Sequence, residues 1–246
     1  MLNALPAPPA RVVSLAPNLT EMVRQLGAEA TLVAVTPFCD APDELRRVPG
    51  GMQPDAEVVL ALEPDLVIAS SITPAPTLRQ LRDLGIRTEV FQTESLDQIR
   101  AAMAQMAAIF GAEATDGDAT KTSPSSRSAV LLFGADTAYS AGCGTHAHEI
   151  LAAAGLRNIA ADASGPWPQL GEEFLLAANP DIIVVADYGD TDKQALLATL
   201  RRHPVRRHLG AVKDGRVLVF PAKAFSVPGP GALEAGEQLR TAVEKL

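Results

Sequence analysis

The sequence predicts an α/β protein of two Rossmann-like lobes, each built on a central parallel sheet that faces a ligand cleft. The main observation is a segment that occurs twice, EVVLALEPDLVIAS at 57–70 and EFLLAANPDIIVVA at 173–186. In both copies a glutamate begins an apolar helical segment, Pro-Asp follows seven residues later, and a run of branched apolar residues comes next. Proline ends a helix, and short β-branched runs are typical of buried parallel strands. Two copies so far apart indicate two similar lobes, not a solenoid of short repeats.

Strands and helices alternate along both halves, which is the second observation. The expected strands are 11–16, 32–35, 66–69, 88–91, 129–133, 159–160, 182–185 and 217–220. The expected helices are 18–26, 57–63, 78–84, 96–110, 146–154, 173–179, 191–200 and 232–246. Asn18 or Thr20 is the expected cap of the first helix, and Gly27 ends it. In such lobes ligands bind at the loops that follow the carboxyl ends of the strands, so two facing lobes enclose a cleft.

The stretch between the two halves changes character, which is the third observation. Residues 111–128, GAEATDGDATKTSPSSRS, have almost no large apolar side chain and are rich in Thr, Ser, Asp and Gly. This composition predicts a single linker between the lobes. The expected domains are a disordered N-terminal segment, an N-terminal lobe, the linker and a C-terminal lobe, with bounds 1–10, 11–110, 111–128 and 129–246.

Composition excludes some classes of function. The 246 residues are 47% hydrophobic and carry a formal net charge of -8, which argues against nucleic acid as the partner. No apolar run reaches the roughly 18 residues needed to span a bilayer. Met1 to Ala10 lacks the basic start and apolar core of a signal peptide, so we expect a cytoplasmic protein or the mature form of an exported one. Cys39 and Cys143 are too few for a disulfide framework.

Six segments resemble the helical-backbone (class III) substrate-binding proteins of bacterial ABC importers. They are RVVSLAPNLTEMVRQLG, VAVTPFCDAP, VPGGMQPDAEVVLALEPDLVIA, LRDLGIRTEVF, AGCGTHAHEILAAAGLRNIAAD and GPWPQLGEEFLLAANPDIIVV, in the family's order. The last is most similar to the cobalamin receptor branch. The resemblance implies a periplasmic or extracytoplasmic receptor, a monomer, that binds a cobalamin-like corrinoid between its lobes and delivers it to membrane permease subunits. It implies no enzymatic activity and no resident cofactor.

The sequence departs from that family in three respects. The family joins its lobes by a long rigid helix, whereas residues 111–128 are shorter and more polar. Ser70 and the Gly50-Gly51 region stand where the cobalamin branch carries tryptophans. A smaller or more polar ligand, or a differently seated corrinoid, is therefore compatible with the sequence. Finally, no export signal is visible.

Trp167 is the main ligand candidate. It is the only tryptophan and lies between two prolines, where a fixed aromatic face can stack on a planar macrocycle. The alternative is a loop residue that covers the core of its own lobe. The predicted ligand-binding residues are Trp167, Tyr139, Phe38, Cys39, Gly51, Met52, Ser70 and Phe225. If the ligand is haem, the Tyr139 phenolate is a candidate axial ligand.

Glu57 and Glu173 open the two copies of the repeat. The resemblance implies that they dock, one on each lobe, onto arginines of the permease. Each begins a helix, keeps its charge in water and can accept a bidentate arginine. The alternative is a first-turn carboxylate that the helix dipole favours by about 0.3–1 kcal/mol.

Other interpretations stay open at this point. A receptor of the same fold for haem, a ferric siderophore or a metal ion is the first, although metal capture needs three or four converging ligands and we expect no metal site. An enzyme built on Cys143 with His146 or His148 is the second, without an evident oxyanion motif or acidic partner. A cytoplasmic relative with an interaction role is the third.

Overall fold

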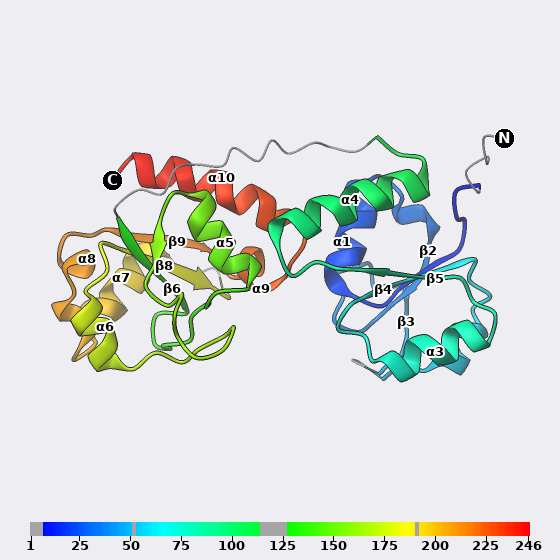
Figure 1. Cartoon of the computed structure of the whole chain (residues 1–246), viewed down its shortest axis with the longest axis horizontal. Helices are drawn as coiled ribbons and strands as arrows, with labels where there is room; N and C mark the ends of the chain where they lie inside the picture. Colours follow the sequence, from blue (N-terminus) through cyan, green and yellow to red (C-terminus); the bar gives the residue numbers. More distant parts are fainter. Residues whose placement is uncertain (1–6, 51–52, 114–126, 190–191) are drawn as a thin grey trace. The chain divides into compact units, whose positions relative to one another are not determined.

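The computed structural model describes residues 7–50, 53–113, 127–189 and 192–246. The chain divides into two compact units, 1–93 with 97–117 and 94–96 with 118–246, which we call the N-lobe and the C-lobe. Each lobe contains one parallel sheet with helices packed on it, so the predicted fold class of two Rossmann-like lobes is confirmed (Figure 1). Within the described ranges, no helix combines the length and the apolar character needed to cross a bilayer.

The N-lobe sheet has the strand order β3-β2-β1-β4-β5. Its strands are β1 (Val12–Ser14), β2 (Leu32–Val35), β3 (Arg46–Arg47), β4 (Leu66–Ser70) and β5 (Thr88–Phe91). The helices of this part of the chain are α1 (Pro17–Gln25), η1 (Glu29–Thr31), α2 (Ala56–Leu60), α3 (Ala75–Asp83) and α4 (Leu96–Phe110). The strand order reverses direction between β1 and β4. That switch point is where doubly wound sheets bind their ligands.

The C-lobe sheet has the order β7-β6-β8-β9. Its strands are β6 (Ser128–Phe133), β7 (Arg157–Asn158), β8 (Ile182–Asp187) and β9 (Val217–Pro221). Its helices are α5 (His146–Ala153), α6 (Glu172–Ala178), α7 (Lys193–Arg202), η2 (Arg206–His208), α8 (Gly210–Lys213), α9 (Lys223–Ser226) and α10 (Pro230–Glu244). The order reverses between β6 and β8, which is the switch point of this lobe.

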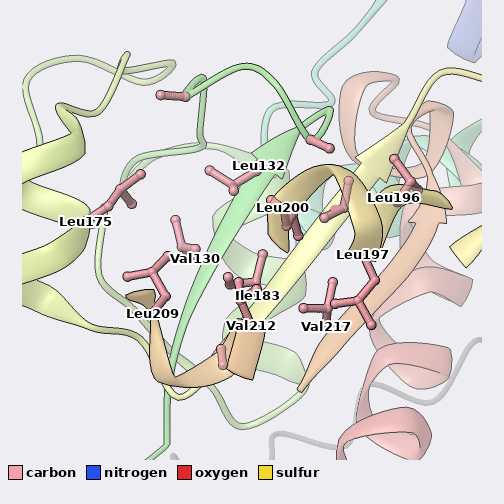
Figure 2. Close-up of a cluster of buried hydrophobic side chains, with 14 of the residues drawn as sticks. Val130, Leu132, Leu175, Ile183, Leu196, Leu197, Leu200, Leu209, Val212 and Val217 are labelled. Atoms are coloured by element: carbon pink, nitrogen blue, oxygen red, sulfur yellow. The ribbon is translucent and has the colours of Figure 1, made fainter. Parts of the chain in front are cut away.

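The central strands are buried on both faces. In the C-lobe, Val130 of β6 and Ile183 of β8 are completely buried with Leu200 of α7 (Figure 2). In the N-lobe, Val13 of β1 and Val67 of β4 are completely buried in the equivalent core. Because helices cover both faces of each sheet, neither face is exposed to solvent, and the sequences of these strands are continuously apolar instead of alternating between apolar and polar residues.

The two copies of the repeated segment fold alike at the residue before Pro-Asp. Glu63 and Asn179 have φ angles of 48° and 38°, and they are the non-glycine residues with positive φ within the described part of the chain. Asn179 is the C-cap of α6, whereas Glu63 lies three residues after the last residue of α2. In both copies the chain turns from this left-handed residue into the following strand. The repeat is therefore a helix–turn–strand unit that occurs once per lobe.

The aspartate of each Pro-Asp pair ties that unit to the first strand of its lobe. The Asp65 carboxylate accepts the backbone N–H groups of Ala10, at 2.7 Å, and Arg11, at 3.1 Å. Asp181 Oδ2 accepts the backbone N–H and the hydroxyl of Ser128, both at 2.7 Å. These bonds from Ser128 hold the pKa of Asp181 below its usual value. In each copy, the aspartate of Pro-Asp thus joins the start of one central strand to the start of its neighbour by hydrogen bonds.

The start of the first helix corrects one prediction. Ala16, in extended conformation, is the N-cap, and Pro17 occupies the first turn of α1. Asn18 and Thr20 lie inside the helix, and Thr20 Oγ1 donates to Ser14 Oγ at 2.8 Å. The prediction that Asn18 or Thr20 caps the helix is wrong, because Pro17 has the fixed φ angle that suits the first helical position.

The shortest elements and the segment borders also differ from expectation. The sequence did not predict β3 or the short helices η1, η2, α8 and α9, and the strand expected at 159–160 lies at Arg157–Asn158. Two-residue strands are too short for a hydrophobic period, and their pairing to a neighbouring strand decides them. Ser128 belongs to β6, so the structured C-lobe begins inside the expected linker, of which residues 114–126 lie outside the described residues. Of the expected N-terminal segment, 1–6 lie outside them as well, whereas Ala10 is fixed by Asp65.

Candidate functional site

Two aromatic side chains lie at the switch point of the C-lobe sheet. Phe133 is the last residue of β6, and Tyr188 directly follows β8. Their ring centroids are 6.4 Å apart at an interplanar angle of 35°. Tyr188 is 72% exposed. Because carboxyl ends of parallel strands share one edge of a sheet, this pair stands where such sheets bind ligands. Neither residue was predicted from the sequence; their positions at the ends of predicted strands were the available signal.

Trp167 extends this pair into what we call the aromatic row, Trp167, Phe133 and Tyr188. The rings of Trp167 and Phe133 meet edge to face, with centroids 5.7 Å apart and an interplanar angle of 64°. Trp167 is 44% exposed, so part of its indole face is open to solvent. The row therefore offers aromatic surface at one edge of the C-lobe.

The loop that carries Trp167 is held by backbone hydrogen bonds. Ser140 N–H donates to the carbonyl of Pro168 at 2.9 Å, and Gly142 N–H donates to that of Pro166 at 2.8 Å. The two prolines flank Trp167 and lack an N–H, so they take part only as acceptors. Gly142 is required here, because a Cβ at this position would lie 2.6 Å from the carbonyl oxygen of Gly165. The tryptophan is consequently presented by a fixed loop.

Tyr139 lies in the segment that pairs with the Trp167 loop. It forms an antiparallel bridge with Gln169, and its side chain is 50% exposed. The structure therefore leaves its ring accessible beside the Trp167 loop. Its predicted contact with a ligand stays a prediction.

His146, the first residue of α5, lies against Trp167 with ring centroids 6.0 Å apart. The residue is buried, and its pKa is lowered from 6.5 to about 4. Burial is the main cause, and a hydrogen bond to the backbone of Phe225 offsets only part of its effect. Its Nε2 atom has no hydrogen-bond partner among the described residues. A neutral imidazole thus supports the tryptophan. Cys143, the nucleophile of the enzyme alternative, is exposed, whereas His146 is not.

Three of the predicted ligand residues lie below the surface in this structure. Phe225 of α9 is completely buried and packs on Phe220, with ring centroids 6.0 Å apart. Cys39 and Ser70 are also buried, and Cys39 Sγ lies 3.2 Å from Thr36 Oγ1. Their side chains support the loops at the carboxyl edges of the sheets. A direct contact with a ligand stays a prediction for all three.

The N-lobe presents two apolar side chains at the corresponding edge. Phe38, in the loop after β2, is 65% exposed, and Ile72, just after β4, is 66% exposed. The Arg47 guanidinium holds the Phe38 loop by donating to the carbonyls of Cys39 and Ala41, both at 2.7 Å. Ile72 was missed from the sequence, because a single isoleucine in a polar loop gives no pattern. Two further predicted ligand residues, Gly51 and Met52, lie outside the described residues.

A concavity of about 460 Å³ adjoins the aromatic row in the C-lobe. It lies between the carboxyl ends of β8 and β9 and α9, with Tyr188 and Lys223 in its wall. Among the described residues, no three His, Cys, Asp or Glu side chains converge as a metal site would require. The edge is therefore suited to a ligand with an apolar or aromatic surface and polar substituents, and the metal-ion alternative has no candidate site in these ranges.

The two repeat glutamates are exposed in the first turns of their helices. Asp55 caps α2, its Oδ1 accepting the N–H groups of Glu57, at 3.0 Å, and Val58, at 3.2 Å. Glu57 and Glu173 are both exposed. Phe174, beside Glu173, is 43% exposed. Both carboxylates are thus open to a cationic partner.

Comparison with known proteins shows which proteins this chain resembles. The profile of a family described as periplasmic binding protein matches residues 12–224. A vitamin B12-binding protein of Pectobacterium carotovorum is 31% identical over 258 residues, covering 97% of this chain and 90% of the relative. The crystal structure of the periplasmic vitamin B12 binding protein of Vibrio cholerae superposes with a TM-score of 0.73 at 28% identity, covering 98% of both chains. A periplasmic heme binding protein from Pseudomonas aeruginosa gives the same score and identity, covering 95% of this chain and 92% of that one.

Proposed function

Because this chain belongs to the periplasmic binding protein family, we propose that it is the substrate-binding receptor of an ABC importer, and that its ligand is a cobalamin-like corrinoid. The family comprises transport receptors without catalytic activity. In this proposal the protein works outside the cytoplasm as a monomer and carries no cofactor of its own. The names of its relatives support the corrinoid, and the aromatic row is the observation in this chain that carries the proposal.

A planar macrocycle is the kind of ligand that such a row favours. Aromatic side chains bring large apolar area at small cost in conformational entropy, and each contributes about 25 cal/mol per Å² that the ligand removes from water. Trp167 and Tyr188 are exposed at the edge, and Phe133 joins them. The concavity beside Tyr188 has room for polar substituents at the rim of a macrocycle. Phe38 and Ile72 are the apolar candidates from the N-lobe.

Glu57 and Glu173 are the proposed docking residues for permease arginines. Each carboxylate is exposed in the first turn of its helix, and both copies of the repeat have a left-handed residue before Pro-Asp, so the two lobes present equivalent groups. An arginine can bind such a carboxylate through two parallel hydrogen bonds. If these glutamates only stabilised the helix dipole, a negative charge would be enough, and replacement of either by aspartate would have no effect. Docking would distinguish Glu from Asp, because it depends on the reach of the side chain.

Haem is the second candidate ligand. Tyr139 is half exposed beside the Trp167 loop, and a tyrosine phenolate is an established axial ligand of haem iron. If haem is the ligand, its absorbance bands shift on binding, and Tyr139→Phe removes the shift while leaving Trp167 in place.

Titration of the purified protein with cyanocobalamin, cobinamide and haem tests the proposal. Trp167 is the only tryptophan, so its quenching reports binding at the aromatic row directly. We expect binding in the micromolar range or tighter. In Trp167→Ala, which has no tryptophan, the affinity is measured by the change in ligand absorbance or by calorimetry, and we expect it to be at least about tenfold weaker. Phe174→Ala is the matched control, because Phe174 is similarly exposed but lies on α6 beside Glu173. Failure of all three ligands to bind, or equal affinity of Trp167→Ala and wild type, would contradict the proposal.

A further inference from the structure

Arg206 is a completely buried cation outside the aromatic row. It begins η2, and 1% of its side-chain surface is exposed. Its guanidinium donates to Glu172 Oε1 from Nε, at 3.1 Å, and from Nη2, at 2.6 Å, and Nη1 donates to the carbonyl of Ala135 at 2.5 Å. Arginine stays protonated in proteins, so this is a permanent charge held in the interior. A buried charge needs such partners, and breaking the pair is costly.

The partner of Arg206 is the residue before a docking glutamate. Glu172 and Glu173 are the first two residues of α6. Glu172 points inward to Arg206, whereas Glu173 is exposed. His203 completes the group, because its Nδ1 accepts the backbone N–H of Arg206 at 3.2 Å and its Nε2 lies 3.8 Å from Glu172 Oε1. The direction of the first turn of α6 is therefore set by an ionic contact below it.

The other end of α6 is tied to the same stretch of chain. Asn179, in its left-handed conformation, accepts the backbone N–H of Gly210 through Oδ1 at 2.9 Å. Arg206 and Gly210 belong to the consecutive elements η2 and α8. A helix of seven residues is too short to be stable by itself, so these two contacts with one segment keep α6 in place.

The first copy of the repeat has no counterpart of the Glu172–Arg206 ion pair. Ala56 stands before Glu57 where Glu172 stands before Glu173. An alanine cannot form an ion pair, and α2 has the Asp55 cap at its start instead. The ionic contact is thus specific to the C-lobe glutamate, although the two segments share their pattern in sequence.

We propose that Arg206 is a positioning residue for docking: through Glu172 it fixes the first turn of α6 so that the Glu173 carboxylate meets its permease arginine. Arg206 itself is buried and does not touch the permease. The inference depends on the proposed function. It makes the two docking contacts unequal, with the C-lobe contact preorganised by a buried charge.

Replacement of Arg206 by methionine tests this inference. In a strain of the source organism that carries the variant as its only copy, we expect uptake of radiolabelled cyanocobalamin to fall at least about tenfold. The dissociation constant of the purified variant for cyanocobalamin should stay within about twofold of wild type, because α6 does not belong to the aromatic row. Arg207→Met is the matched control, since Arg207 is the neighbouring arginine and is exposed. That control should keep both properties.

A double variant, Glu172→Gln with Arg206→Met, separates positioning from stability. Removing both charges restores the melting temperature lost in the single variant, because no unpaired charge remains. We expect uptake to stay low, since the first turn of α6 is no longer held. The inference would be overturned if Arg206→Met supported uptake at the wild-type level. It would also be overturned if the double variant recovered uptake as well as melting temperature. If deletion of the gene leaves uptake unchanged, or wild-type protein binds no cyanocobalamin, the proposed function itself fails.

Discussion

Acid should destabilise the C-lobe through His146. The unfolded chain takes up a proton on this imidazole near pH 6.5, whereas the folded chain does so only near pH 4, because the ring is buried against Trp167. Above pH 6.5 the imidazole is neutral in both states and does not affect the pH dependence of stability. Between pH 6.5 and 4 only the unfolded chain binds the proton, so the free energy of unfolding falls. The difference between the two pKa values corresponds to roughly 3 kcal/mol, of which roughly 2 kcal/mol is lost by pH 5.

Urea unfolding at pH 7.5 and pH 5, followed by Trp167 fluorescence, measures this loss. The fluorescence reports the C-lobe, because the only tryptophan lies there against His146. His146→Phe removes the titration and keeps an aromatic ring beneath Trp167, so its loss between the two pH values should be smaller than that of wild type by roughly 2 kcal/mol. His208→Phe, at an exposed position, is the control and should behave like wild type. Equal losses in wild type and His146→Phe would refute the reasoning.

Two further predictions concern the repeated segment. Glu63→Gly should raise the free energy of unfolding by roughly 1 kcal/mol in urea titrations, because Glu63 has a φ of 48° and glycine adopts this region without strain; a loss of stability would contradict this account of the turn. Asp181→Asn should lower stability at pH 7 by about 1 kcal/mol, since the two bonds from Ser128 become weaker. The pKa of Asp181 is lowered on folding, so its contribution is present above pH 3.8 and disappears as the pH falls through the folded-state pKa. Wild type should therefore lose more stability than Asp181→Asn in acid, and parallel acid profiles would contradict this.

Much of the fold could be predicted because it depends on local pattern. The buried strands around Val67 and Ile183 are continuous apolar runs, and the repeat with Pro-Asp marks where each begins. The first helix cap was misplaced because several residues near Pro17 have capping side chains, and the proline decides among them. β3 could not be predicted from two arginines, since its pairing to β2 depends on a partner far along the chain.

The candidate site could be predicted only in part. Trp167 was identified because it is unique in composition and flanked by prolines. Phe133 and Tyr188 were not, because the contact between them depends on strand order: β6 and β8 are neighbours at the switch point although their ends lie 54 residues apart in sequence. The burial of Phe225 is equally a matter of packing, since nothing in its loop sequence distinguishes an inward ring from an outward one.

The sequence by itself determined that there are two lobes, that each contains the same helix–turn–strand unit, and that each unit begins with an exposed glutamate. These features depend on hydrophobic period, on proline and on the type of residue, all of which are local. Only the tertiary structure decided which aromatic rings meet, that Asp65 and Asp181 join neighbouring strands, and that Arg206 lies buried beneath Glu172. Such contacts join positions that are distant in the chain. Their energy depends on burial and on the partner that the fold supplies, and neither is encoded in the neighbouring residues.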